Sequence, residues 1–390
     1  MKDRHIKMRL HNAKAVAYTK IYGVTHPIRP QILCASFRGR QYADSPRNIS
    51  EMLHELHPEI DIIWALNSND DPYGIIPSYV KKVKYNSKEY YQSLATSFCF
   101  IANNEMRPNI AKRKGQYFIQ TWHGDRSFKK VLYDDLDDWN DTYRANVVRD
   151  DAVTDICLAA SDYGERVYRS AFRYNGEILR VGMPRNDQLL NVSLEKAEII
   201  KKKLNVDTNS KLIMYAPTFR DDKLHESCEV VDIEALVEWL CSETGDTWKG
   251  LYRAHSLGKG IGSNGRVLDV SDYPDMADLL LISDAVITDY SSVSGDYMLM
   301  DRPMVLALFD LDDYTKSSRQ LSVSLDEVGL PIAKNMNELH SLMLKSINQK
   351  KLLGRDQAMN YYGVTESGDS TRTVVNLIIE RFNAFFSRED

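Results

Sequence analysis

The sequence lacks any run of about 18 apolar residues, the length that a membrane-spanning helix requires. Its first residues also lack the apolar stretch of a secretory signal peptide. We therefore expect a chain that neither spans a membrane nor leaves the cell by the secretory route. There is no low-complexity tract and no internal repeat of short period, so a repeat architecture is not expected.

Cysteine pairs and an excess of positive charge are missing as well. The five cysteines are scattered, are odd in number and never stand in C-x-x-C spacing. Most have apolar neighbours, which predicts small buried side chains in a reducing cytosol and no zinc site. The formal net charge is -5 and the pI is about 6.0, which argues against a protein dedicated to nucleic acid, although local patches can still bind phosphate.

What the sequence does contain is material for two hydrophobic cores. With 390 residues, of which 43% are hydrophobic and 27% charged, the chain exceeds what one core normally organises. We predict a basic leader over residues 1–30, an N-terminal domain over 31–190 and a C-terminal domain over 205–390. The boundary is expected between Asp187 and Ser210, where a charged helix passes into a polar stretch.

The leader is basic and carries apolar residues between its charges. A single acid, Asp3, stands among the basic residues Lys2, Arg4, Lys7, Arg9, Lys14 and Lys20. This pattern fits a foot on an anionic membrane surface, and it fits a solvated helix packed on its own protein equally well.

Apolar strand patterns alternate with helical patterns along both halves of the chain. The expected strands are 32–37, 60–66, 98–102, 117–122, 155–160 and 178–181, then 212–216, 250–253, 267–270, 285–288 and 304–308. Helices are expected from Pro46, over 87–97, 162–172, 193–204, 232–241 and 274–281, and from Leu339 to the end. This alternation predicts an α/β fold of two Rossmann-like, doubly wound domains that face a cleft, with the last helix crossing back to brace the first domain.

The stretch 282–303, which reads ISDAVITDYSSVSGDYMLMDRP, is the anchor of the second domain. A short apolar strand ends at Asp289, and Ser291 with Ser292 precede the next helix. Ligands gather at this position in a parallel sheet, where hydroxyl and backbone donors suit a diphosphate. The same residues are also ordinary helix caps, and both interpretations stay open at this point.

His123 directly follows an apolar strand in the stretch QTWHGDRSFKK. An imidazole at the end of a strand is placed for proton transfer, because its unperturbed pKa is near neutrality. A histidine bonded to backbone in a loop would fit the pattern as well. Lys129 and Lys130 could serve the same anionic site or coat the surface.

Cationic residues end two further strands in the second half. Arg220 ends YAPTFRD, and Arg253 with His255 follow the next strand in LYRAHS. Guanidinium groups bind phosphate oxygens well, so these strand ends and the serine pair predict a converging anion pocket that needs no metal. An interdomain salt bridge is the alternative for any one of these residues.

Other patterns carry less information about function. The acidic runs at Asp70–Asp71 and at 134–138 fit solvent-facing loops better than a metal site, so a divalent metal is not indicated. The glycines of 258–265 lack the Lys-Ser/Thr of a P-loop, so no nucleoside triphosphate site is expected.

With these motifs assembled, the chain resembles the CDP-glycerol glycerophosphotransferase family of teichoic acid and capsule synthesis. The matching stretches are SFRGRQYADSP (36–46), GQYFIQTWHG (115–124), VGMPRND (181–187), YAPTFRD (215–221), RAH (253–255) and 272–303. Their order and combination are specific, although no single stretch is.

This resemblance implies a GT-B arrangement, with the nucleotide on the C-terminal domain and the acceptor approaching from the N-terminal one. It implies transfer of glycerol phosphate from CDP-glycerol to a hydroxyl of a lipid-linked acceptor, with release of CMP and no required cofactor. The expected location is the inner face of the bacterial cell membrane, where the chain would be peripheral. His123 and His255 match the two histidines of the family's active site.

The resemblance and the strand-end pattern together give a set of candidate site residues. We assign His123 and His255 as catalytic, Arg220, Arg253, Asp289, Ser291 and Ser292 to the donor, and Gly124, Asp125, Arg126 and Lys130 to the acceptor.

Two departures from the family concern the acceptor more than the reaction. Asp125 and Arg126 stand where the family usually has Thr-Pro, and Ser256 stands where it usually has Pro. Asp125 could orient His123 or select the acceptor. The nearest alternative donor is CDP-ribitol. More distant alternatives are a GT-B glycosyltransferase that uses a nucleotide sugar and a non-catalytic subunit that binds nucleotide or polymer.

Overall fold

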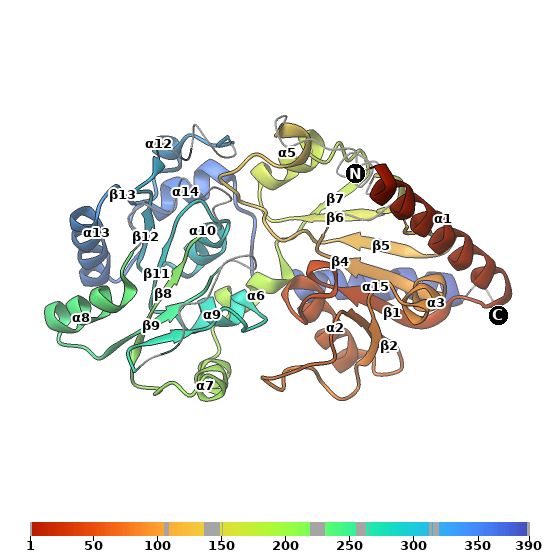
Figure 1. The fold of residues 1–390 in the computed structure, drawn as a ribbon, viewed down its shortest axis with the longest axis horizontal. Coiled ribbons are helices and arrows are strands. Elements are labelled where there is room, and N and C mark those ends of the chain that lie inside the picture. The colour runs from red at the N-terminus through yellow and green to blue at the C-terminus, as the bar shows by residue number, and fades with distance from the viewer. Residues whose placement is uncertain are drawn as a thin grey trace. The chain divides into compact units, whose positions relative to one another are not determined.

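The computed structural model describes residues 2–104, 109–135, 149, 151–218, 231–254, 263, 265–311, 314 and 320–387. The chain divides into two compact units, each built around one parallel sheet (Figure 1). Unit 1 comprises Met1–His123, Val131–Asp187 and Thr365–Asp390. Unit 2 comprises Gly124–Lys130 and Gln188–Val364.

The sheet of unit 1 has seven strands in the order β3-β2-β1-β4-β5-β6-β7. The strands are β1 (Arg29–Ala35), β2 (Asp61–Leu66), β3 (Lys81–Lys84), β4 (Ser97–Ala102), β5 (Tyr117–Gln120), β6 (Ile156–Ala159) and β7 (Glu177–Arg180). The central strands are almost continuously apolar and are buried on both faces, as expected for a parallel sheet that helices cover.

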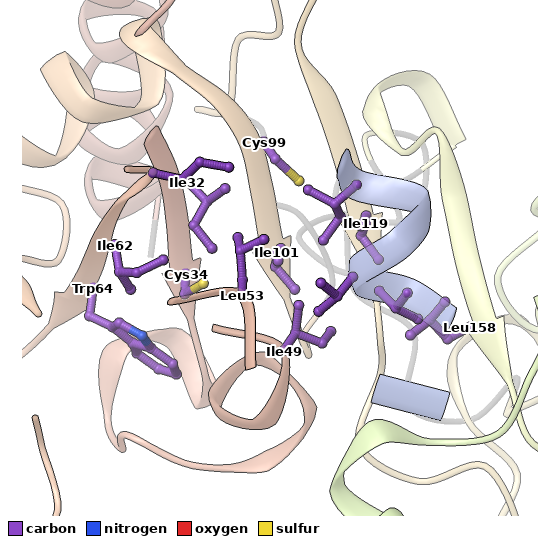
Figure 2. Packing of buried hydrophobic residues seen from close by; sticks show 14 of the residues in the cluster. Ile32, Cys34, Ile49, Leu53, Ile62, Trp64, Cys99, Ile101, Ile119 and Leu158 are labelled. Atoms are coloured by element: carbon purple, nitrogen blue, oxygen red, sulfur yellow. The ribbon is translucent and has the colours of Figure 1, made fainter. Parts of the chain in front are cut away.

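Helices cover both faces of this sheet because side chains alternate along each strand. Ile32 and Cys34 of β1 point to the face covered by α2 (Asp44–Leu56) and α15 (Ser370–Phe386), and Figure 2 shows this cluster. Leu33 and Ala35 point to the other face, which α1 (Lys2–Thr25) and α3 (Lys88–Thr96) cover. Helix α5 (Asp162–Ser170) packs against β6.

The last helix, α15, belongs to unit 1 although it follows all of unit 2 in the chain (Figure 1, blue helix among the red and orange elements). Its residues Val374, Val375 and Ile378 are fully buried in the same cluster as β1 and α2. The Asp187 carboxylate accepts hydrogen bonds from the first backbone N–H groups of α15, at 3.1 and 2.7 Å. The sequence prediction grouped residues 205–390 in one domain, whereas residues 365–390 cluster with unit 1 through these contacts.

One side of helix α1 packs on unit 1, and the other side is exposed. Ala15 and Thr19 are buried, whereas the apolar side chains of Leu10, Ile21 and Val24 are 56%, 70% and 86% exposed. Among the helices that the structure describes, none is both long enough and apolar enough to cross a membrane.

The sheet of unit 2 has six strands in the order β10-β9-β8-β11-β12-β13. The strands are β8 (Lys211–Ala216), β9 (Trp248–Tyr252), β10 (Val267–Asp269), β11 (Ala285–Thr288), β12 (Met304–Ala307) and β13 (Ile332–Ala333). Its helices are α6 (Asp187–Leu190), α7 (Leu194–Lys203), α8 (Ile233–Thr244), α9 (Met276–Ile282), α10 (Val293–Tyr297), α12 (Leu325–Val328), α13 (Met336–Gln349) and α14 (Arg355–Tyr362).

Short 3-10 turns occur in both units. They are η1 (Phe37–Gly39), η2 (Leu132–Asp134) and η3 (Pro184–Asn186) in unit 1 and η5 (Met298–Met300) in unit 2.

The two sheets share one topology, because the strands of unit 2, numbered from β8, follow the same order as the first six of unit 1. In each unit the chain builds outward on one side of its first strand and then returns to build on the other. The strand order therefore reverses between β1 and β4 in unit 1 and between β8 and β11 in unit 2. In open α/β sheets, ligands bind at this switch point, outside the carboxyl ends of the strands.

Candidate functional site

His123 stands at the switch point of unit 1. Its Nδ1 lies 2.6 Å from the backbone carbonyl oxygen of Asn103, which directly follows β4. A carbonyl only accepts hydrogen bonds, so Nδ1 carries the ring proton and Nε2 keeps its lone pair. The ring also packs on Phe37 and Trp122, with centroid distances of 5.6 and 4.2 Å. One tautomer of the imidazole is thus held in a fixed orientation.

The surroundings of His123 keep the imidazole neutral. Burial is the main cause that lowers its pKa, and the positive charges of Arg185 and Arg38 lower it further, to about 4. The hydrogen bond to Asn103 acts in the opposite direction but is outweighed. At neutral pH the ring is therefore unprotonated and can accept a proton at Nε2.

The loops around His123 hold an unusual share of strained backbone. Trp122 has φ 52°, and Phe37 and Arg38 have φ 48° and 57° in the turn after β1. Positive φ is uncommon for non-glycine residues and persists where the surrounding structure enforces it, often at functional sites. Gly39 follows with φ 79°, and a Cβ there would lie 2.8 Å from Cβ of Tyr85, so this turn requires glycine.

Arg185 lies on the same side of unit 1 as His123. It is 5% exposed, its backbone N–H donates to Oγ of Ser45 at 3.4 Å, and its guanidinium lies 3.6 Å from the Asp44 carboxylate. Asp44 and Ser45 begin α2, which follows the turn that carries Arg38. The two arginines, from the segments that follow β1 and β7, both act electrostatically on His123.

Sequence reasoning missed Arg38, Arg185 and Asn103 as parts of this site. A signal for the arginines was present, because SFRGRQYADSP and VGMPRND were both among the family-like stretches, but no role was given to them. Asn103 directly follows the expected strand 98–102, and no role was assigned to it. Its tie to His123 depends on β4 and β5 being neighbours, which the sequence pattern does not specify.

In unit 2, Asp289 stands at the switch point after β11 and is almost fully buried. Both of its carboxylate oxygens accept from the backbone N–H of Thr218, at 2.9 and 3.0 Å. Asp289 thereby fixes the backbone at Thr218, two residues before Arg220 in the chain. Arg220 itself and His255 lie outside the residues that the structure describes.

Ser291 and Ser292 are partly exposed and precede α10. Oγ of Ser291 accepts from the backbone N–H of Val293 at 3.3 Å, and its carbonyl oxygen accepts from Oγ of Ser294 at 2.8 Å. The serines thus have the local contacts of a capping turn, and they remain accessible to a ligand.

Arg253, predicted to bind the donor, is buried at the end of β9. Its guanidinium donates to the backbone carbonyl oxygens of Val270 and Tyr273, which follow β10. These bonds tie two strand ends together. The described contacts of Arg253 are therefore those of a residue that holds the ends of β9 and β10 together.

The acceptor residues predicted after His123 belong to unit 2, not to unit 1. Arg126 is 1% exposed, and its Nε donates to the Gly295 carbonyl at 2.9 Å while a terminal nitrogen lies 3.3 Å from the Asp296 carboxylate. Asp125 is buried beside it, with its carboxylate 3.8 Å from the Arg126 guanidinium. The pair anchors the segment after His123 to α10.

Gly124 and Lys130 complete this segment. Gly124 is partly exposed, and Nζ of Lys130 donates to Oε1 of Gln320 at 2.7 Å. The backbone N–H of Lys130 also donates to the Gln320 carbonyl at 3.0 Å. The segment therefore leaves β5 of unit 1 and at once joins the contacts of unit 2.

Within the described part of the chain, no group of three or more His, Cys, Asp or Glu residues could hold a metal ion. Four cysteines, Cys34, Cys99, Cys157 and Cys241, form no disulfide among the described residues, and burial raises the pKa of the Cys34 and Cys99 thiols. These thiols are therefore protonated side chains of the core.

Fold and site together define a class: a two-domain α/β protein with Rossmann-like sheets and polar side chains gathered at the switch point of each. The chain belongs to the CDP-glycerol:poly(glycerophosphate) glycerophosphotransferase family, whose family model matches residues 22–380.

Curated relatives carry names from teichoic acid synthesis. A teichoic acid poly(glycerol phosphate) polymerase of Staphylococcus epidermidis is 34% identical over 307 residues, which are 75% of this chain and 42% of that protein. Its namesake from Bacillus subtilis is 28% identical over 374 residues, 90% of this chain and 49% of that protein. The chain thus spans less than half the length of these two relatives. A teichoic acid glycerol-phosphate transferase of Staphylococcus aureus is 30% identical over 328 residues, 80% of this chain and 83% of that protein.

Solved structures of the wall teichoic acid polymerase TagF match along the whole chain. One is 29% identical with a TM-score of 0.81, covering 99% of this chain and 97% of that one. A TagF variant soaked with CDPG is 28% identical with the same TM-score, covering all of both chains.

Proposed function

We propose that this chain transfers glycerol phosphate from CDP-glycerol to a hydroxyl group of a teichoic acid acceptor and releases CMP. Membership of the family supports the donor, and the names of the relatives support the acceptor. The observation that carries the proposal is the fixed tautomer of His123, because a general base for an acceptor hydroxyl needs an unprotonated nitrogen in a defined direction.

In the proposed reaction, the acceptor oxygen attacks the phosphorus that bears glycerol. The bond from that phosphorus to the oxygen of CMP breaks, and CMP leaves with the bonding electrons. The hydroxyl proton passes to Nε2 of His123, and the acceptor oxygen forms the new phosphodiester. Transfer of this kind depends mainly on positioning and on stabilisation of negative charge.

Donor binding is proposed for unit 2. Arg220, His255 and the hydroxyl groups of Ser291 and Ser292 would stabilise charge on the diphosphate and on departing CMP. The buried contacts of Asp289 and Arg253 support a different task for these two, which is to hold the backbone from which the donor-binding side chains project. A GT-B arrangement is proposed with it, since the donor on unit 2 must meet an acceptor held by unit 1.

Association with the inner face of the bacterial membrane is proposed for helix α1. The exposed apolar side chains of Leu10, Ile21 and Val24 support this, together with the exposed lysines Lys14 and Lys20. A helix with such residues lies in the interface of an anionic membrane, where a lipid-linked acceptor would be within reach.

The test is an assay of the purified chain with CDP-glycerol, CDP-ribitol and common sugar nucleotides, each beside a panel of lipid-linked acceptors. CMP release and growth of the acceptor by glycerol phosphate are expected with CDP-glycerol, followed by mass spectrometry. CDP-ribitol is the informative competitor, because a poly(ribitol-phosphate) polymerase is also a relative, at 25% identity. Turnover with CDP-ribitol or a sugar nucleotide in place of CDP-glycerol would overturn the proposal, as would nucleotide binding without turnover.

A further inference from the structure

We propose that Arg38 and Arg185 form a subsite beside His123 for a phosphate group, and that this group is the phosphodiester of the acceptor next to its attacking hydroxyl. The inference rests on the proposed function and deepens it. It assigns to unit 1 an acceptor that must carry negative charge, and it names the residues that recognise that charge.

The first support is the way one buried residue ties the parts of the subsite together. Oδ1 of Asn103 accepts from the backbone N–H of Phe37 at 2.7 Å, while its backbone carbonyl oxygen lies 2.6 Å from Nδ1 of His123. Asn103 itself is fully buried after β4. The turn after β1, which continues from Phe37 into Arg38, is therefore fixed against the imidazole at the switch point.

The second support is the shape of that turn. Phe37 and Arg38 both adopt positive φ, although neither is glycine, and the Phe37 ring lies against the His123 ring. Asn67 reinforces the conformation, because its side-chain amide donates to the Arg38 carbonyl at 3.1 Å. A backbone held in this sparsely populated region gives the partly exposed Arg38 side chain a defined origin beside the base.

The third support is the second cation. Arg185 is held by its backbone bond to Ser45 and faces the Asp44 carboxylate at 3.6 Å. Burial lowers the pKa of His123 most, and the charges of Arg185 and Arg38 lower it further, so both guanidinium groups add positive potential at the imidazole. The buried side-chain nitrogen of Asn103, which has no acceptor among the described residues, adds to this potential.

Phosphate is the ligand chemistry that fits two guanidinium groups best, because planar N–H forks match its oxygens. The acceptor is the source that fits unit 1. A growing poly(glycerophosphate) chain carries a phosphodiester one glycerol away from its terminal hydroxyl. Arg38 and Arg185 would hold that phosphodiester while His123 receives the proton of the hydroxyl.

Binding of such an anion would also activate the base. A negative charge beside His123 offsets the two arginines and raises the pKa of the imidazole toward neutrality. The ring would then become a stronger base when the acceptor is in place.

A direct test needs no turnover. The full chain, labelled with nitrogen-15 in histidine, is titrated with acid and followed by NMR with and without glycerol 3-phosphate. The wild-type His123 signal should titrate at about pH 4 without ligand, and glycerol 3-phosphate should raise this midpoint by at least about one pH unit. In Arg38→Gln the ligand-induced rise should be lost, and the midpoint without ligand should itself lie higher.

The matched control is Arg40→Gln, which removes an exposed arginine from the same turn and should keep the full rise. Arg185→Gln should behave like Arg38→Gln. If Arg185→Gln does not fold, Arg38→Gln still decides the result, because Arg38 is partly exposed. An unshifted wild-type midpoint, or a shift retained in Arg38→Gln, overturns the subsite whether or not the chain is active.

Kinetics then separate the two sources of phosphate. In Arg38→Gln, KM for a phosphodiester-containing acceptor should rise at least about tenfold, while KM for CDP-glycerol stays within about twofold. With an acceptor that lacks the neighbouring phosphodiester, wild type and Arg38→Gln should have the same KM for the acceptor. A rise confined to KM for CDP-glycerol would mean that the arginines hold the donor diphosphate, and would overturn the assignment to the acceptor.

Discussion

At the scale of single residues, the catalytic assignment depends on one backbone oxygen. The carbonyl of Asn103 fixes which nitrogen of His123 is free, and the neighbouring rings fix where it points. No other described side chain offers a comparable base at the switch point of unit 1, so the assignment can be tested by removing the imidazole.

Replacing His123 by alanine should lower kcat by about 10²–10⁴-fold, the range that a general base contributes. Affinity for CDP-glycerol should stay nearly unchanged, because donor binding is proposed for unit 2. Steady-state kinetics and calorimetric titration with CDP-glycerol measure the two quantities. His57→Ala is the control, since His57 lies in the same unit and its side chain pairs with the exposed Glu59. Retained turnover in His123→Ala would remove its proposed role.

The lowered pKa of His123 predicts a pH dependence of stability. Its pKa falls from 6.5 to about 4 on folding, so the unfolded chain binds a proton between these values that the native ring does not. The contribution of His123 to stability is therefore lost as pH falls from 6.5 toward 4, and it is constant above 6.5. Urea unfolding from pH 4 to 8 should show a shallower acid loss in His123→Gln, and identical slopes would contradict the shift.

The sequence identifies His123 because the strand before it and the motif around it are both visible. The roles of Asp125 and Arg126 are not visible, because a loop pattern does not show against which sheet a side chain will pack. The tertiary contacts with Gly295 and Asp296 make Arg126 a buried anchor. At this scale, the sequence shows which residues follow the strands, but it does not show which residues position them.

At the scale of elements, the contact of the 124–130 segment with α10 leaves no room for a methyl group. A Cβ on Gly295 would lie 2.6 Å from Cβ of Arg126 and 2.9 Å from its backbone oxygen. Gly295→Ala should therefore destabilise unit 2 by about 1–3 kcal/mol, although alanine favours helix. Thermal unfolding measures the loss, and hydrogen exchange should increase in residues 124–130. Gly265→Ala is the control, because no atom of the described residues lies within 4 Å of its Cβ position. Equal stability of both variants would contradict the close packing.

The exposed side of α1 predicts a second effect at this scale. The double variant Ile21→Glu, Val24→Glu should bind phosphatidylglycerol vesicles at least about tenfold more weakly. It loses exposed apolar area and gains two negative charges. Cosedimentation with vesicles measures this, with phosphatidylcholine vesicles for comparison. Leu194→Glu is the control, since Leu194 of α7 is 77% exposed outside α1. Equal binding by the wild type, the double variant and Leu194→Glu would show that α1 is not the membrane contact.

The expected strands of the central sheets are present in the structure, because an apolar run buried on both faces has a strong sequence signal. Two edge strands were missed. Lys81–Lys84 of β3 has charged side chains at an exposed edge, and β13 has only two residues, Ile332 and Ala333. Edge strands form through the neighbour that pairs with them, so their own sequence says little.

At the scale of the molecule, α15 forms part of the core of unit 1. A substitution in α15 should therefore destabilise unit 1. Ile378→Ala should cost about 2–5 kcal/mol, because its side chain is fully buried in the core of unit 1. Hydrogen exchange should rise in β1 and β4 and stay unchanged in β8 and β11. Leu240→Ala of α8 should produce the reverse pattern, because Leu240 lies in the core of unit 2. The same pattern in both variants would contradict separate cores.

The alternating pattern predicts two halves and a last helix that crosses back to the first domain. Periodicity alone does not show which residues of that domain the helix will contact. The partner is decided by the carboxylate of Asp187, 183 residues before Ser370, and by the apolar face of α2, more than three hundred residues before it.

This arrangement has a consequence for biosynthesis. A ribosome must translate every residue of unit 2 before it reaches Ser370–Phe386, so unit 2 can fold while unit 1 still lacks a helix of its core. Until then, the apolar face that includes Ile119 and Leu158 stays uncovered on the nascent chain, where chaperones would recognise it. The unit that begins at the amino terminus is thus the one that matures last.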